Sequence, residues 1–151
     1  MAESAHRVRC SVRAIIIADG KLLVQRPIGN SSACYAFIGG EYEVGDTFEQ
    51  RLRREFEEET SARVVHVEYL FVVENAFRDG DSVHHAVEHF FAVELDRSVV
   101  ESREAHLGQH WLPVDRLREF DVRPTVVRDA IASGDYRRHR HFVVERQEGP
   151  C

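Results

Sequence analysis

The chain has 151 residues, of which 43% are hydrophobic, and a formal net charge of −6 at pH 7. This length predicts a single domain over residues 1–151, and the hydrophobic content is enough for a sizeable core. The negative charge argues against nucleic acid as a partner, because nonspecific nucleic-acid binding needs a basic surface. The N-terminal segment lacks the apolar core of a signal peptide, and no run approaches the roughly 18 apolar residues of a membrane span. We therefore expect a cytoplasmic protein without a membrane partner.

Strands are predicted in the first part of the chain. Residues 8–18 are rich in β-branched and apolar side chains, which is typical of a strand. Asp19 and Gly20 form a strong hairpin signal, so residues 21–26 are expected to return as the partner strand. After a polar loop, a short strand at 35–38 leads the chain to a pair of glycines.

A helix is predicted after the glycine pair. Asp46 and Thr47 are both good N-cap residues, and each has Glu or Gln three positions on, which makes a capping box. Phe48, Leu52 and Phe56 then recur every four residues, the spacing of one buried helical face.

The end of this helix carries a run of glutamates. Glu55, Glu58 and Glu59 fall within an arc of about 100° beside the apolar face, where they repel one another. Such a group is either an acidic, solvated helix face or a site for a hard divalent cation such as Mg²⁺, which prefers oxygen ligands. Arg51 and Arg54 lie nearby and could hold the carboxylates in place.

The spacing from Gly40 to residue 62 resembles the Nudix box. Gly40 is followed by five residues, Asp46, seven residues and then REFEEETSA. The family pattern has Glu where this chain has Asp46, and Gly where it has Ser61. The shorter Asp46 side chain leaves its pairing with Arg54 open, and Ser61 would be strained if the site needs a positive φ.

The resemblance implies a fold and a function. The fold would be α/β (α+β), a Nudix-like α/β/α sandwich with a mixed β-sheet between helices. The activity would be hydrolysis of the pyrophosphate linkage in a small nucleotide, a nucleoside diphosphate linked to another moiety X. The cofactor would be Mg²⁺, with Mn²⁺ as a possible substitute, and a homodimer is common in similar proteins.

The resemblance also implies roles for individual residues. Glu58 and Glu59 would be the main metal ligands, and Glu55 would be a ligand or the base that acts on the attacking water. Gly40 would offer its backbone carbonyl to a metal ion. Arg54 would orient one of the glutamates through a salt bridge.

The rest of the chain is expected to alternate strands and loops. After the helix we expect strands at 63–77 and 83–95, a polar loop at 96–108, a short strand at 110–113, a short helix after it, a second helix between Pro124 and Gly134, and a final strand at 142–145. In some Nudix proteins a loop glutamate from this region reaches the metal cluster and serves as base. The resemblance makes Glu104 that candidate, and a solvated loop acid is the alternative.

Three histidines lie on the strand at 83–95. Side chains alternate along a strand, so His85 and His89 should share one face, while His84 and Glu88 share the other. A transition-metal site, a substrate cleft and a solvated face all remain open.

Two other functions remain open beside hydrolysis. One is a Nudix-fold module that senses a nucleotide without turnover, although the chain keeps the box arginine and glutamates. The other is an isomerase of isoprenyl diphosphates, which would need a nucleophilic cysteine such as Cys34. The sequence identifies no substrate-binding residues.

Overall fold

The computed structural model describes residues 7–138 and 140–148. In chain order the elements are β1 (Val8–Ile15), β2 (Ile17–Ala18), β3 (Lys21–Pro27), β4 (Tyr35–Ala36), β5 (Ile38–Glu41), α1 (Phe48–Glu59), β6 (Val64–Asp79), β7 (Ser82–Leu95), β8 (Leu107–Pro113), the 3₁₀ helix η1 (Val114–Glu119), β9 (Val122–Arg123), α2 (Thr125–Ala132) and β10 (His141–Glu148). None of the helices formed by the described residues has the length and apolar character needed to cross a membrane.

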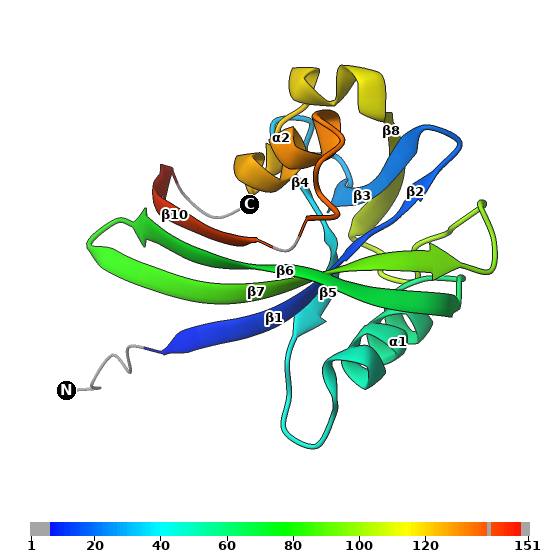
Figure 1. Ribbon diagram of the computed structural model, residues 1–151, viewed down its shortest axis with the longest axis horizontal. Helices are drawn as coiled ribbons and strands as arrows, with labels where there is room; N and C mark the ends of the chain where they lie inside the picture. Colours follow the sequence, from blue (N-terminus) through cyan, green and yellow to red (C-terminus); the bar gives the residue numbers. More distant parts are fainter. Residues whose placement is uncertain (1–6, 139, 149–151) are drawn as a thin grey trace.

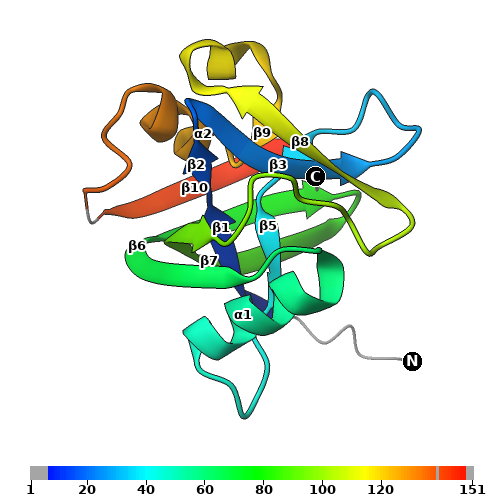
Figure 2. The same cartoon turned by 90° about the vertical axis from the view of Figure 1, so that its right-hand side faces the viewer.

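The strands form two sheets. The first has the order β10-β6-β7-β1-β5, with β1 parallel to β7 and antiparallel to β5. The second has the order β2-β3-β4-β9, and β8 pairs with β3 beside this path. Helix α1 lies on one side of the first sheet, and the second sheet with α2 lies on the other (Figures 1 and 2). The predicted class, a mixed α and β fold with helices on both sides, is confirmed.

The predicted strands are present, but two of them are divided. The strand expected at 8–18 breaks at Ile16, and the one expected at 35–38 breaks at Phe37. Each break lets the chain leave one sheet and join the other, because β1 and β5 pair in the first sheet while β2 and β4 pair with β3 in the second. One predicted sheet therefore becomes two.

The first hairpin forms as predicted. Asp19 and Gly20 both have positive φ, 50° and 71°, as a tight turn between antiparallel strands requires. This turn sets the register of the hairpin, in which Ala18 lies opposite Lys21 and Ile17 lies opposite Leu22.

Helix α1 begins and ends through local contacts. Thr47, rather than Asp46, is the N-cap, and it forms the capping box with Gln50. At the other end Thr60 caps the helix in an extended conformation. Ser61 does not have a positive φ, since Asp19 is the one non-glycine residue in that region among the described residues. Serine therefore carries no backbone strain here.

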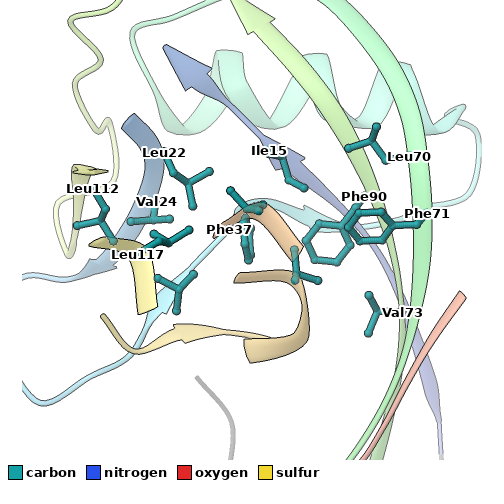
Figure 3. Close-up of a cluster of buried hydrophobic side chains, with 13 residues drawn as sticks. Ile15, Leu22, Val24, Phe37, Leu70, Phe71, Val73, Phe90, Leu112 and Leu117 are labelled. Carbon is teal, nitrogen blue, oxygen red and sulfur yellow. The ribbon is translucent and has the colours of Figure 1, made fainter. Parts of the chain in front are cut away.

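Two buried clusters fix the layers. Leu52 and Phe56 of α1 are fully buried against Val12 and Ala14 of β1, and complete burial of a large apolar side chain contributes about 1.5–3 kcal/mol. Figure 3 shows the other cluster, in which Phe71 and Phe90 of the first sheet share a core with side chains of the second sheet, among them Leu22, Val24 and Leu112.

Candidate active site

A buried arginine organises the acidic side of α1. The side chain of Arg51 is only 4% exposed, and its Nη2 lies 2.8 Å from Oε1 of Glu55 and 3.4 Å from Oε2 of Glu58. Its Nη1 lies 3.1 Å from Glu43 and 3.6 Å from Asp46. One guanidinium is thus shared by four carboxylates, which it holds at the end of the glycine-pair loop and along the helix.

The second box arginine has a different partner. Arg54 is 55% exposed, and its Nη2 lies 3.1 Å from Oδ1 of Asp46, whose side chain is buried. The shorter Asp46 side chain therefore still forms the ion pair. The guanidinium that contacts the glutamates is Arg51, so the predicted orienting contact of Arg54 on a glutamate is absent among the described contacts.

Each residue of the glycine pair is required by a different close contact. A Cβ at Gly39 would lie 1.9 Å from the backbone oxygen of Val12 in the neighbouring strand. A Cβ at Gly40 would lie 2.3–2.7 Å from the carboxylate atoms of Glu55. Gly39 therefore permits the pairing of β5 with β1, while Gly40 leaves room for the Glu55 carboxylate.

Glu55 and Glu59 are neighbours in a partly dehydrated environment. The pKa of Glu59 is raised to about 7, and burial is the largest cause. The charge of Glu55, a hydrogen bond with Glu55 and the charge of Glu104 add to the rise. Burial also raises the pKa of Glu55, although Arg51 opposes this. Oε2 of Glu59 is buried without a hydrogen-bond partner in the described part of the chain. Without a cation, the pair therefore tends to retain a proton near neutral pH.

The predicted loop glutamate lies near this pair. Ser61 donates its backbone N–H to the carbonyl of Glu101 at 2.9 Å, and Arg103 donates its own to the carbonyl of Glu59 at 2.6 Å. These bonds attach the loop to the end of α1, and the charge of Glu104 acts on the pKa of Glu59. The structure thus brings together the four predicted glutamates, residues 55, 58, 59 and 104.

The acidic group suits a hard divalent cation in its chemistry. All of its donors are carboxylate oxygens, one of them the unpartnered Oε2 of Glu59, and such oxygens are the ligands Mg²⁺ prefers. Within the described residues, however, no three His, Cys, Asp or Glu side chains are arranged to hold a metal ion. Arg51 contacts Glu55 and Glu58 instead, so these two carboxylates would have to turn from it toward an ion.

A cavity of about 260 Å³ lies on the face of the first sheet that is turned away from α1. Along β1, Val12 and Ala14 pack toward α1, so the alternating Arg9, Ser11 and Arg13 face the cavity. The cavity is also lined by side chains from β6, β7 and β9.

Arg13 connects the cavity with the carboxylates. Its Nη1 donates to the carbonyl of Phe37 at 3.4 Å, and its Nε lies 3.5 Å from Oε1 of the buried Glu88. Burial raises the pKa of Glu55 and Glu59, and the charge of Arg13 opposes this rise in both. The guanidinium of Arg13 therefore lies within electrostatic range of the acidic group.

The histidines separate as the alternation predicted, with one exception. His84 lines the cavity together with Glu88, while His89 stacks on Phe48 of α1 with ring centroids 4.4 Å apart. His85, expected on the face of His89, also borders the cavity at its outer end. The described residues contain no metal-binding group here either.

Sequence reasoning missed the cavity residues. The polar positions Arg9, Ser11 and Arg13, two apart in an otherwise apolar strand, were the available signal. Cys34, the nucleophile that an isomerase would need, is buried and does not line the cavity.

A family model of the NUDIX domain matches residues 8–131, which include the glycine pair, the acidic helix and the cavity wall. The chain belongs to the Nudix family. As a Nudix hydrolase, it falls among enzymes that generally use divalent metal ions and act on small nucleotides.

Solved structures share the Nudix fold at low sequence identity. The mutator MutT protein of Bacillus halodurans has a TM-score of 0.72 and 16% identity, over 91% of this chain and 89% of that one. A structure from a study of MutT from Aliivibrio salmonicida and Vibrio cholerae has a TM-score of 0.66 and 20% identity, over 85% of this chain and 99% of that one. The E. coli ORF135 protein has a TM-score of 0.62 and 22% identity, over 88% of this chain and 94% of that one. No match was found among the curated proteins.

Proposed function

We propose that this Nudix hydrolase is a single-domain, magnesium-dependent pyrophosphohydrolase, with Mn²⁺ as a possible substitute. Its substrate would be a nucleoside diphosphate linked to another moiety X. The observation that carries the proposal is the hydrogen bond from Arg103 to the carbonyl of Glu59 at 2.6 Å, which attaches the loop of Glu104 to the end of the box helix, so that the charge of Glu104 acts on Glu59. A solvated acidic helix face would not require a loop acid to approach it.

The metal ligands would be Glu55, Glu58, Glu59 and the backbone carbonyl of Gly40. A bound divalent cation neutralises the diphosphate, lowers the pKa of water and stabilises the leaving oxygen. The unpartnered oxygen of Glu59 supports this assignment. So does the absence of a side chain at Gly40, which leaves the Glu55 carboxylate beside the strand.

The residues of the chain would divide the hydrolytic step between them. Water forms a bond to one phosphorus, the bridging P–O bond breaks, and a carboxylate accepts the proton of the water. Glu55 and Glu104 are the candidate bases, since a positioned carboxylate not fully engaged by metal can take a proton. Arg51 would keep Glu55 and Glu58 in place, and Arg54 would hold Asp46.

The proposal is tested by a substrate screen. Purified protein with Mg²⁺ is incubated with ADP-ribose, nucleotide sugars, dinucleotides and nucleoside triphosphates, and phosphate release is followed with and without added phosphatase. We expect turnover that a chelator abolishes. Glu58→Gln should reduce it strongly, while Glu57→Gln, the exposed neighbour in the same run, serves as the matched control.

Other outcomes point to the alternatives. Thermal stabilisation by a nucleotide without turnover of any compound would favour a sensing module. Isomerisation of an isoprenyl diphosphate that Cys34→Ala abolishes would favour the isomerase, whereas pyrophosphate hydrolysis should survive this substitution.

A further inference from the structure

The cavity wall is rich in arginine although the chain as a whole is acidic. Arg9 and Arg13 of β1 and Arg123 of β9 line the same cavity. The acidic side chains of the lining are Glu41 and Glu88. A concave surface lined by guanidinium groups attracts anions, and phosphate is a group that arginine frequently binds in a bidentate manner.

Most of these charges already have a partner. Glu41 forms an ion pair with Arg7, which lies outside the cavity, and Glu88 pairs with Arg13. Arg9 differs from them, because it has no hydrogen bond or ion pair with any described residue, and its side chain is exposed. Arg9 is thus the guanidinium of the lining that is free to bind an anion.

The third lining arginine is also occupied. Arg123 lies 3.0 Å from Asp121 through its Nε and 3.1 Å through its Nη2, and Asp121 is not part of the lining. Arg13 and Arg123 are therefore both paired with a carboxylate, and Arg9 is the lining arginine without one among the described residues.

Arg9 and Arg13 mark opposite ends of the cavity. They are four positions apart in the strand, which corresponds to about 13 Å along β1. Arg13 lies at the end near the carboxylates, beside Phe37. Arg9 lies opposite Ala86 in the neighbouring strand, at the outer end that His84 and His85 border. A phosphate chain bound near the carboxylates and Arg13 would leave Arg9 for a second, separate anionic group.

Aromatic side chains lie at both ends of the cavity. Phe90 is opposite Arg13 in the neighbouring strand, and Arg13 donates to the carbonyl of Phe37. At the outer end Phe77 stacks on His84 with ring centroids 5.2 Å apart. Between the two arginines the lining is polar, with Ser11 opposite Glu88. A ligand that extends from Arg13 to Arg9 would therefore pass polar groups and have a cationic and an aromatic group at each end.

We propose that the cavity selects substrates whose cavity-bound part carries a phosphate monoester of its own, in addition to the diphosphate that is cleaved. Arg9 binds this second phosphate and sets the preference. The inference rests on the proposed function, because it names the class of substrate for the same site. It separates phosphorylated dinucleotides and related compounds from nucleotide sugars whose sugar is neutral.

Two pairs of compounds differ by a single phosphate and test the proposal directly. NADPH is compared with NADH, and coenzyme A with dephospho-coenzyme A, by kcat/KM in the presence of Mg²⁺. The phosphorylated member of at least one pair should be favoured by about ten- to hundredfold, the effect expected of one charge-assisted contact. In Arg9→Gln this ratio should fall toward one. Arg116→Gln removes an exposed guanidinium of η1 that is not part of the lining, and should keep the ratio.

A binding measurement separates this inference from the proposed function. Calorimetry without metal compares adenosine 2′,5′-bisphosphate and adenosine 3′,5′-bisphosphate with AMP. Tighter binding of a bisphosphate that Arg9→Gln removes would support the inference even if no compound is turned over, in which case the proposed function fails alone. Equal affinities for all three, or equal kcat/KM within both substrate pairs, would overturn the role of Arg9. A preference unchanged by Arg9→Gln would overturn it as well.

Discussion

The carboxylate cluster and the cavity differ in how the chain builds them. The cluster takes most of its side chains from two turns of α1, from Arg51 to Glu59. The cavity takes its wall from β1, β4, β5, β6, β7 and β9, which pairing brings together from distant parts of the chain. A site on one helix is visible as a spacing in the sequence, whereas a site between strands depends on the whole topology.

The two regions also differ in charge. Acids surround one buried guanidinium in the cluster, while arginines prevail in the cavity wall. Arg13 lies between them, paired with Glu88 and within range of Glu55 and Glu59. A substrate that spans both regions would place its diphosphate at this boundary.

The largest expected effect concerns the loop acid that completes the cluster. If Glu104 is the base, Glu104→Gln should lower kcat by about 10²–10⁴-fold, the range for a positioned acid or base, while leaving the cavity unchanged. Single-turnover kinetics with saturating Mg²⁺ would measure it, with Glu101→Gln in the same loop as the control. An unchanged rate would identify Glu104 as a solvated loop acid.

The next effect is on stability. Arg51→Met should destabilise the metal-free protein by about 3–5 kcal/mol, because it leaves Glu55 buried without its partner. Arg54→Met removes an exposed guanidinium and leaves Asp46 with Arg51 as its partner, so it should cost about 1 kcal/mol or less. Urea denaturation would measure both, and added Mg²⁺ should recover part of the first loss by binding the folded state. Equal losses in the two variants would contradict the central position of Arg51.

A smaller effect should separate chemistry from folding. Gly40→Ala places a methyl group against the Glu55 carboxylate, whose flexible side chain can shift with little loss of stability. A displacement of about 1 Å at a reacting group can cost roughly 10²-fold in rate, so kcat should fall by about that factor. Kinetics and thermal melting of the same sample test the two parts. Full activity would show that Glu55 need not occupy this position.

The last prediction is a pH dependence of the metal-free cluster. The pKa of Glu59 is raised from the ordinary 4.5 to about 7, so the folded protein binds a proton that the unfolded chain has released. The stabilising contribution is therefore complete below pH 4.5 and is lost as the pH rises through 7. Urea midpoints across this range should decline in the native protein, and Glu59→Gln should reduce the decline. Glu88 in the cavity adds a contribution of the same sign, because burial raises the pKa of its carboxyl as well.

The sequence predicted what short-range contacts determine. The hairpin at Asp19 and Gly20, the capping box of Thr47 and the buried face of α1 depend on residues within a few positions of one another. The grouping of the box glutamates follows from helical spacing in the same way. Glu104 became a candidate base through the family resemblance, because helical spacing cannot predict a contact with a distant loop.

The remaining features depend on tertiary packing. Arg51 and Arg54 are both within reach of the glutamates on the helix, but Arg51 is buried while Arg54 is exposed, and this decides their partners. The division of the sheet at Ile16 and Phe37 depends on strand pairs between distant segments, since β1 pairs with β5 while β2 and β4 pair with β3. Arg9 and Arg13 became a cavity wall only when β7 and β9 supplied the other sides.

The hydrogen bonds that attach the loop around Arg103 to the end of α1 have a consequence for the dynamics of turnover. A loop that carries a base often acts as a lid, and its closure can then limit the rate. Here the loop carrying Glu104 is bonded to the backbone of the same helix that carries Glu59. The distance between these two acids is therefore set by folding rather than by substrate arrival, and solvent viscosity should affect substrate entry and product release without affecting the assembly of the cluster.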